Sequence, residues 1–300
     1  MYDRGLGVLE QYGLTAETVL RGRGALICQT EKGWKSIREY WGSPGRLEQQ
    51  RKIQKRCKEN GFLLVDQVEE NLEGQVVTTG EDGIPYVVKE WFQGTECNTR
   101  SGEDILSSME AMAKLHTVMQ AEQDEDMPGA DLLEECRRHN RELRRTRKFV
   151  QKKKAKNPFE ERLAQSITAF LEAGEGMVKE LEDFDYERFC KEHRQEVCHG
   201  DCNQHNIIFT REGIGFMNFE YWHCGPQTED LCLFMRKILE KHNWDPELGR
   251  RMAEQYNRKR SLSDGRVETS ETVPFLSVEV LETGKLLCIQ SEGMDIQKKH

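Results

Sequence analysis

Residues 197–231 read VCHGDCNQHNIIFTREGIGFMNFEYWHCGPQTEDL, and this stretch carries the clearest chemical signal in the chain. His199-Gly200-Asp201 is followed by Asn206, so one loop offers a carboxylate and a neutral amide oxygen. Phosphoryl transfer uses such a pair, because a carboxylate orients or deprotonates the attacking hydroxyl and an amide helps to hold Mg2+ against the phosphates. The loop therefore predicts phosphotransferase chemistry.

The residues after this loop predict a β-hairpin. Ile207-Ile208-Phe209 is a short apolar strand, Arg211-Glu212-Gly213 is a turn, and Ile214 to Met217 returns as a second strand. This hairpin would bring Asn218 and Glu220 back beside the amide of the loop. Because residues two apart share one face of an extended chain, we predict that both side chains reach one metal ion.

The order of these motifs resembles that of the aminoglycoside phosphotransferase and choline kinase superfamily: HGDxxxxN, a strand ending in Asp-Phe-Glu or similar, then GPxxxDL. The closer wording, HGDCNQHNIIF with NFEYWHCGPQTEDLCLFMRKILEK, is similar to CotS-type spore-coat proteins of endospore-forming bacteria, a kinase-like branch of that superfamily. The resemblance implies a protein-kinase-like α+β fold with a small antiparallel β-rich N-lobe and a larger helical C-lobe. It also implies ATP, or another nucleoside triphosphate, and Mg2+ as cofactors.

The resemblance assigns a role to each motif residue. Asp201 would be the catalytic base, Asn206 a metal ligand, and Asp230 the structural aspartate that steadies the loop. Asn218 stands where the superfamily has its main metal-binding aspartate, although an asparagine here also looks usual for the CotS-type branch. An amide brings a dipole and not a full charge, so we expect weaker metal binding, which Glu220 would offset.

Two functions follow from this pattern and stay open. The first is an ATP- and Mg-dependent phosphotransferase that acts on a hydroxyl of a small molecule or a coat component. The second is a catalytically inactive kinase-like protein that serves assembly of the spore coat and contacts other coat proteins. The substitution at Asn218 favours the second, whereas the retained Asp201, Asn206 and Glu220 favour the first.

Residues 1–94 predict the β-rich nucleotide lobe. Gly22 and Gly24 lie in a turn between two short apolar strands, where the backbone would cover nucleotide phosphates. An ordinary hairpin also needs such glycines, so this signal is weak alone. The segment from Trp34 to Tyr40 reads as the next strand.

Three further positions in this lobe are candidates for nucleotide binding. Arg38 stands where the superfamily has a phosphate-binding lysine, but its guanidinium is bulkier and forked. A helix is predicted from Pro44 to Asn60, and Glu48 in its first turns is either the ion-pair partner of Arg38 or an exposed helix charge. The predicted strand from Tyr86 ends in Glu90-Trp91-Phe92-Gln93-Gly94, which resembles the hinge that binds adenine through its backbone.

Residues 95–265 predict the helical lobe. The apolar residues around His116 repeat at helical spacing, which favours a core histidine over a catalytic one. The basic stretch from Cys136 to Lys156 is either a cationic face for an anionic partner or a solvated helix in an inserted helical hairpin, and we favour the hairpin.

The composition of the chain limits the cellular compartment and the binding partners that we expect for it. The chain has 300 residues, a 36% apolar fraction and a net charge of −9, which argues against general nucleic-acid binding. No apolar run resembles a signal peptide or is long enough to span a membrane, so we expect a protein that is made in the cytoplasm and does not contact a membrane. If the protein is a coat component, we expect it to be assembled onto the spore coat.

The cysteines predict free thiols. None of the ten forms a CxxC pair, as is ordinary in a reducing cell. A zinc site is conceivable near the loop but matches no structural zinc spacing; it would use Cys198, Cys202, His205, His223 and Cys224.

The segment 266–300 does not fit the rest of the chain. It keeps only one aromatic residue, Phe275, whereas the ending of resembling family members is aromatic and lysine-rich. Ser277 to Lys299, back-translated with permitted codons and read one nucleotide later, gives PWKYWKLANYYAYKVKAWISKK, which resembles that ending. We therefore predict a shift of the reading frame near Arg266, which resequencing of the locus would test.

Overall fold

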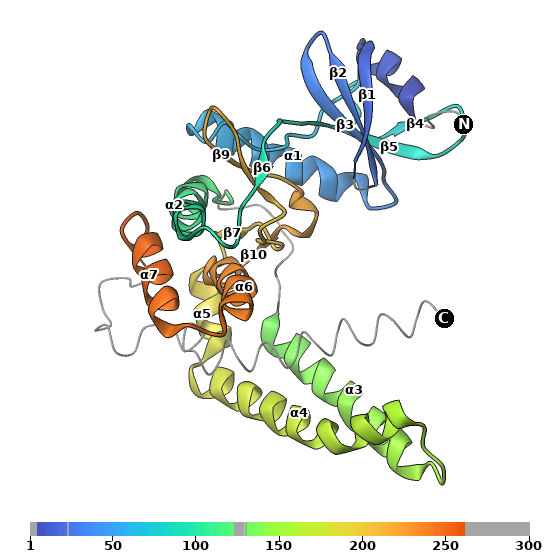
Figure 1. Ribbon diagram of the computed structural model, residues 1–300. Helices are drawn as coiled ribbons and strands as arrows, with labels where there is room; N and C mark the ends of the chain where they lie inside the picture. Colours follow the sequence, from blue (N-terminus) through green and yellow to red (C-terminus); the bar gives the residue numbers. More distant parts are fainter. Residues whose placement is uncertain (1–4, 23, 123–128, 130, 262–300) are drawn as a thin grey trace.

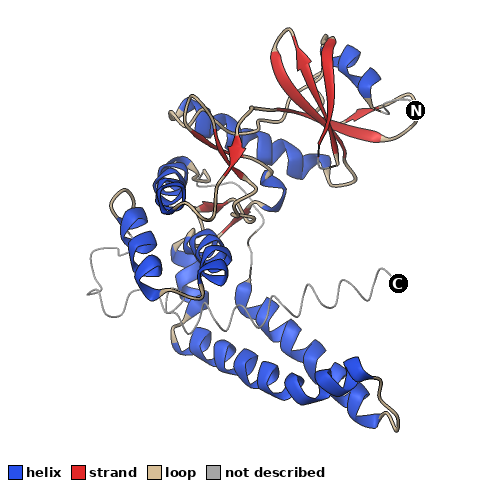
Figure 2. Ribbon diagram, in the orientation of Figure 1, coloured by secondary structure: helices blue, strands red, loops and turns tan. Residues whose placement is uncertain are grey.

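The computed structural model describes residues 5–22, 24–122, 129 and 131–261, and it has two lobes (Figure 1). Strands dominate the N-terminal lobe and helices the C-terminal lobe (Figure 2), as the sequence predicts. The segment assigned to a frame shift lies outside the described residues. The elements of the N-terminal lobe are η1 (Leu6–Tyr12), β1 (Ala16–Gly22), β2 (Ala25–Thr30), β3 (Gly33–Glu39), α1 (Pro44–Glu59), β4 (Thr78–Thr79) and β5 (Pro85–Glu90).

One antiparallel sheet forms the N-terminal lobe, with strand order β1-β2-β3-β5-β4. Successive side chains alternate between its faces. Ile37 of β3 and Val88 of β5 are paired and pack with η1 on one face. Arg38 therefore points to the opposite face, together with Ser36 and its partner Lys89.

Helix α1 packs under that second face. Pro44 begins the helix, where its missing N–H costs nothing. Its buried stripe contains Leu47, Ile53 and the amide side chains of Gln50 and Gln54. The buried residues recur at helical spacing, so their packing against the sheet fixes the rotation of α1 about its axis. This rotation decides which polar residues of α1 face the cleft between the two lobes.

The chain crosses between the lobes as a strand. β6 (Thr95–Glu96) pairs with β8 (Ile207–Phe209), which pairs with β9 (Ile214–Phe216). Gly94 precedes β6, and a Cβ there would lie 2.3 Å from the carbonyl oxygen of Phe209. Only glycine fits this close approach.

The C-terminal lobe is built around α2 (Gly102–Val118), whose Met109 and Met112 are fully buried. Within the described ranges, none of the helices is both long and apolar enough to cross a bilayer. The remaining elements are α3 (Leu132–Lys152), α4 (Pro158–Asp183), α5 (Tyr186–Glu192), β7 (Val197–Cys198), η2 (Phe219–Tyr221), β10 (His223–Cys224), α6 (Thr228–Leu239), η3 (Glu240–His242) and α7 (Pro246–Asn257).

Helices α3 and α4 form a long hairpin that projects away from the rest of the chain (Figure 1). Its basic residues face acidic ones on α4: Arg137 lies 2.8 Å from Glu182, and Arg144 lies 2.7 Å from Glu175. The basic stretch is thus the surface of a helical hairpin, which confirms the favoured prediction.

Candidate active site

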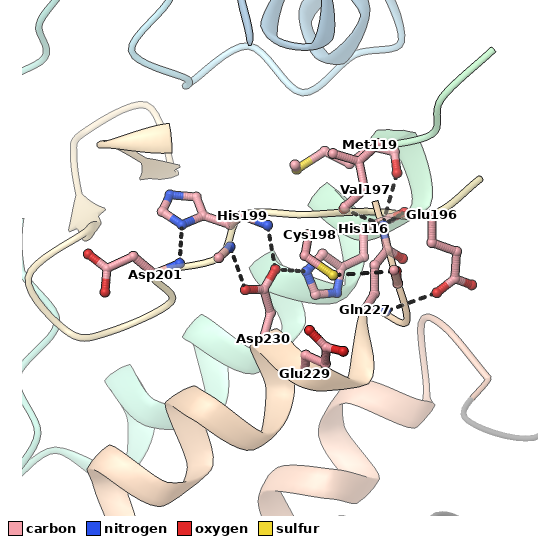
Figure 3. A network of polar contacts seen from close by, with 12 residues as sticks. His116, Met119, Glu196, Val197, Cys198, His199, Asp201, Gln227, Glu229 and Asp230 are labelled. Carbon is pink, nitrogen blue, oxygen red and sulfur yellow. Dashed lines mark hydrogen bonds and ion pairs between the residues drawn. The ribbon is translucent and has the colours of Figure 1, made fainter. Parts of the chain in front are cut away.

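Asp230 anchors the loop at residues 199–201 (Figure 3). It lies buried in the first turn of α6 and accepts hydrogen bonds from the backbone N–H groups of His199 (2.5 Å) and Gly200 (2.8 Å). Its carboxylate also lies 3.2 Å from Nε2 of His116. Burial alone would raise its pKa, but the hydrogen bond and charge of His116 and the hydrogen bond from the Gly200 N–H lower the pKa of Asp230 to about 2. The loop is therefore held by a side chain that is ionised at neutral pH, and His116 is a core histidine, as predicted.

Backbone geometry makes glycine necessary in the loop. Gly200 has a φ of 80°, and a Cβ there would lie 2.1 Å from the carbonyl oxygen of Tyr221. His199 is buried, and this burial lowers the pKa of its imidazole. Its Nε2 lies 2.9 Å from the Met217 carbonyl, and its Nδ1 lies 3.2 Å from the Asp201 N–H. A neutral His199 that donates from Nε2 satisfies both contacts.

The carboxylate of Asp201 is fixed by two amide groups. Asn203 Nδ2 donates to Oδ1 at 2.8 Å, and Asn206 Nδ2 donates to Oδ2 at 2.8 Å. Asp201 is half-buried. The loop thus presents a carboxylate in a defined orientation, which is the geometry that a proton acceptor needs.

Asn218 closes this hydrogen-bonded chain. Its Nδ2 donates to Oδ1 of Asn206 at 2.7 Å, so the predicted approach of these two residues is confirmed. Asn218 adopts a left-handed conformation, with φ 67° and ψ 59°, directly before η2. Asparagine tolerates this conformation better than most residues. Its backbone N–H donates to the buried Asp66 at 2.8 Å.

The prediction that Glu220 shares a face with Asn218 is wrong. The left-handed turn at Asn218 and the 3-10 helix η2 replace the extended chain that the prediction assumed. Glu220 instead forms an ion pair with Lys89 of β5, whose ammonium also lies 3.6 Å from Asp66. Although burial alone would raise it, Lys89 lowers the pKa of Glu220. Burial raises the pKa of Asp66 to about 6, against the pull of Lys89.

A cleft of about 510 Å³ lies between the lobes, above the amides of Asn206 and Asn218. Five of the predicted nucleotide- and metal-binding residues line it: Gly22, Arg38, Phe92, Asn206 and Asn218. Twelve others complete it: Leu20, Arg21, Ala25, Ile27, Trp34, Trp91, Gln93, Gly94, Glu96, His205, Ile208 and Met217. Cationic groups and aromatic rings thus share one cavity, which suits a planar ligand with an anionic tail.

Three of the predicted cofactor-binding residues do not line this cleft. Glu48 is half-buried, and no ion pair with Arg38 forms within the described ranges, because the packed stripe of α1 turns other residues inward. Glu90 is paired with Lys58 of α1, so its side chain faces the helix. Gly24 stays in the exposed turn after β1.

Lys89 and Asp66 were not identified from the sequence. Each is a charged residue that directly follows an apolar run, Tyr86-Val87-Val88 before Lys89 and Leu63-Leu64-Val65 before Asp66. A charge next to such a run is a usable signal, since buried charges need partners. Lys89 pairs with both Asp66 and Glu220, and Glu220 lies far away in the chain, so this pairing was not readable from the sequence.

Comparison with solved structures shows which proteins share this fold. The structure resembles an aminoglycoside phosphotransferase from Alicyclobacillus acidocaldarius, with a TM-score of 0.73 and 16% identity over 96% of each chain. It also resembles a spectinomycin phosphotransferase in complex with ADP and spectinomycin (TM-score 0.67, 13% identity, 98% of this chain and 87% of that one). An amicoumacin kinase in complex with AMP-PNP, Ca2+ and Ami gives a TM-score of 0.64 at 13% identity, covering 96% of this chain and 85% of that one. No curated protein matches the sequence.

These likenesses confirm the protein-kinase-like two-lobed fold. The sequence itself matches the phosphotransferase enzyme family APH over residues 44–270, more than half of the chain. That range begins at α1 and includes the loop that carries Asp201, the amide pair and Asp230. The chain therefore belongs to the APH phosphotransferase enzyme family.

Proposed function

We propose that this protein transfers a phosphoryl group from ATP to a hydroxyl group of a small molecule. The observation that carries the proposal is the carboxylate of Asp201, fixed by the amides of Asn203 and Asn206 beside the interlobe cleft. A carboxylate in this setting accepts the proton of an attacking hydroxyl. Membership of a phosphotransferase family supports the same chemistry.

The nucleotide would lie in the cleft that Gly22, Arg38 and Phe92 line. Phe92 offers a ring for the base, and the guanidinium of Arg38 offers a charge for the phosphates. The ADP-bound and AMP-PNP-bound relatives support a nucleotide site in this fold.

A divalent cation fits this site in part. Asn206 offers an amide oxygen, but Asn218 donates its Nδ2 to that oxygen, so the Asn218 amide must rotate before its own oxygen can serve as a ligand. Glu220 is held by Lys89 and lies outside the cleft-lining residues. Asn206 and Asn218 would hold Mg2+, which supplies positive charge beside the phosphates when bound.

The substrate class follows from chemistry and relatives. The relatives named for spectinomycin and amicoumacin support a small-molecule acceptor. The resemblance to CotS-type proteins supports a finer proposal, in which the protein is made in the cytoplasm and acts on, or is assembled into, the spore coat.

A catalytically inactive kinase-like protein of the spore coat is the second candidate. Two contacts favour it: Lys89 neutralises Glu220, and the amides of Asn206 and Asn218 satisfy each other. Both contacts give these polar side chains a partner within the protein, so none of them needs a cation. In this case the fold would serve assembly, and substitution of Asp201 would leave the localisation of the protein to the forming spore unchanged.

Calorimetric titration with ATP distinguishes between the active phosphotransferase and the catalytically inactive coat protein. We expect binding to the purified full chain with Mg2+ and weaker binding in EDTA, because the cation screens the phosphate charge. Arg38→Ala should weaken binding in both conditions. No binding by a protein shown to be folded would overturn the proposed activity and support the scaffold.

Asn218→Asp should increase the affinity for Mg2+ in the presence of ATP by roughly tenfold, since it adds a full ligand charge. Without metal, the new carboxylate meets the oxygen of Asn206 and loses the 2.7 Å hydrogen bond, so the melting temperature should fall in EDTA. Asn218→Ala is the control, because it removes the same hydrogen bond without adding charge. Equal metal affinity in the aspartate and alanine variants would exclude a ligand at this position.

A further inference from the structure

Behind the candidate active site lies a second cluster of potential metal ligands. The Sγ of Cys198, the imidazole of His223 and the carboxylate of Glu229 lie within 4.8 Å of one another. His223 of β10 and Glu229 in the first turn of α6 are close in sequence, whereas Cys198 of β7 comes from an earlier segment. This set differs from the one that the sequence suggests: His205 instead contacts Glu96, and Cys202 lies near Asp230.

The separations suit a tetrahedral cation with mixed ligands. Zinc bonds of about 2.3 Å to sulfur and about 2.0 Å to nitrogen place neighbouring ligand atoms about 3.5 Å apart. The Nε2 of His223 is 2.9 Å from Oε2 of Glu229, and the Sγ of Cys198 lies within 4.8 Å of both groups. Side-chain rotations would bring these three atoms around one ion.

Outer contacts orient two of these ligands. Nδ1 of His223 lies 3.1 Å from the carbonyl oxygen of Tyr221, so a neutral imidazole that donates from Nδ1 would present the lone pair of Nε2 to a cation, in place of the present contact of Nε2 with Glu229. The hydroxyl of Tyr186 contacts the other oxygen of Glu229. A backbone carbonyl behind a histidine and a hydroxyl behind a carboxylate are the outer partners that metal sites use.

Charge and access also favour a cation. Burial, together with the carboxylates of Asp230, Glu229 and Glu196, raises the pKa of the Cys198 thiol, so a cation must displace its proton in order to bind the thiolate. The same carboxylates make the potential here negative, which attracts a cation. Cys198 is fully buried, whereas the side chains of His223 and Glu229 are 16% and 20% exposed. An ion could enter from the side of these two residues.

We propose that Cys198, His223 and Glu229 bind a thiophilic divalent cation of the Zn2+ class, at a site separate from the nucleotide cleft. Thiolate, imidazole and carboxylate together select such a metal over Mg2+. Cys198 directly precedes His199, and Glu229 directly precedes Asp230 (Figure 3). The bound cation would tie β7 to α6 at the base of the catalytic loop.

Titration of the metal-free full chain with Co2+ tests this assignment. A thiolate ligand gives a sulfur-to-cobalt charge-transfer band in the near ultraviolet, which we expect in the wild type and which Zn2+ should remove by displacement. Cys198→Ala should abolish the band, and His223→Gln should weaken Co2+ binding by at least tenfold. Tyr186→Phe should weaken it by about tenfold through loss of the outer contact.

Cys28→Ala serves as the control, since it removes an equally buried thiol from the N-terminal lobe and should keep the band. If Cys198→Ala does not fold, the partly exposed His223→Gln still decides. A folded wild type without the band, or a band that survives both Cys198→Ala and His223→Gln, would overturn the site.

Discussion

Replacing Asp201 with asparagine is expected to lower the turnover of ATP by about 10²–10⁴-fold, the usual contribution of a general base. The substitution keeps the size of the side chain but removes its ability to accept a proton. Asn203 and Asn206 both donate to this carboxylate, so the new amide must break one of these bonds, a loss of about 1 kcal/mol. This loss of stability is small compared with the expected loss of turnover.

Nucleotide binding should stay nearly intact in this variant, because Asp201 is not among the residues that line the cleft. The measurement is ATP consumption with a panel of hydroxyl-bearing small molecules, beside calorimetric ATP binding. Asn203→Ala is the matched control: it removes one amide contact to Asp201 and keeps the base, so turnover should fall far less. Equal losses of binding and turnover, or full activity in Asp201→Asn, would contradict the assigned role.

Lys89→Met should destabilise the fold by about 3–5 kcal/mol, the usual cost of removing one partner from a buried ion pair. The side chain of Lys89 is 3% exposed and that of Asp66 is 2% exposed. Without the ammonium, the carboxylate of Asp66 stays buried without a cationic partner, beside the carboxylate of Glu220, which is 32% exposed. Asp66 also accepts hydrogen bonds from Gln54 and the backbone of Asn218, so its displacement would disturb the active-site turn.

Urea unfolding, followed by circular dichroism, measures this loss. Lys35→Met is the matched control, because Lys35 is also a buried lysine of the same sheet, and among the described residues it forms its ion pair with Glu69, whose side chain is 31% exposed. Its loss should be smaller, since water can solvate the freed carboxylate. Combining Lys89→Met with Glu220→Gln should restore part of the stability. Equal effects of the two lysine substitutions would rule out a charge cluster at Asp66.

Much of the site was readable from the sequence because its chemistry is local. The residues from His199 to Asn206 form one loop, and the short hairpin after it returns the chain beside that loop. Apolar runs separated by glycine turns also predicted β1, β2 and the return strand correctly. In such segments the chain itself sets the geometry, so neighbours in sequence remain neighbours in space.

The errors arose where distant elements decide orientation. For Glu48 the sequence left open an ion pair with Arg38 or an exposed helix charge. The rotation of α1 follows the packing of its stripe through Leu47 and Ile53, and no such ion pair forms among the described residues. Glu220 was expected at the metal, but the left-handed turn at Asn218 redirects it. The preference of asparagine for that conformation was available from the sequence and would have argued against an extended chain.

The pairing of β6 with β8 limits how the two lobes can move. From Thr95 onward the crossing chain is hydrogen-bonded into the small sheet of the helical lobe. Up to Trp91 it is tied to the N-terminal sheet, where the Trp91 N–H donates to the Trp34 carbonyl at 2.9 Å. Residues 92–94 join the two anchored ends. A second backbone contact also ties the lobes, because the Phe216 N–H donates to the Leu64 carbonyl at 2.9 Å. The cleft should therefore open by rotation about these two links, with little sliding of one lobe past the other.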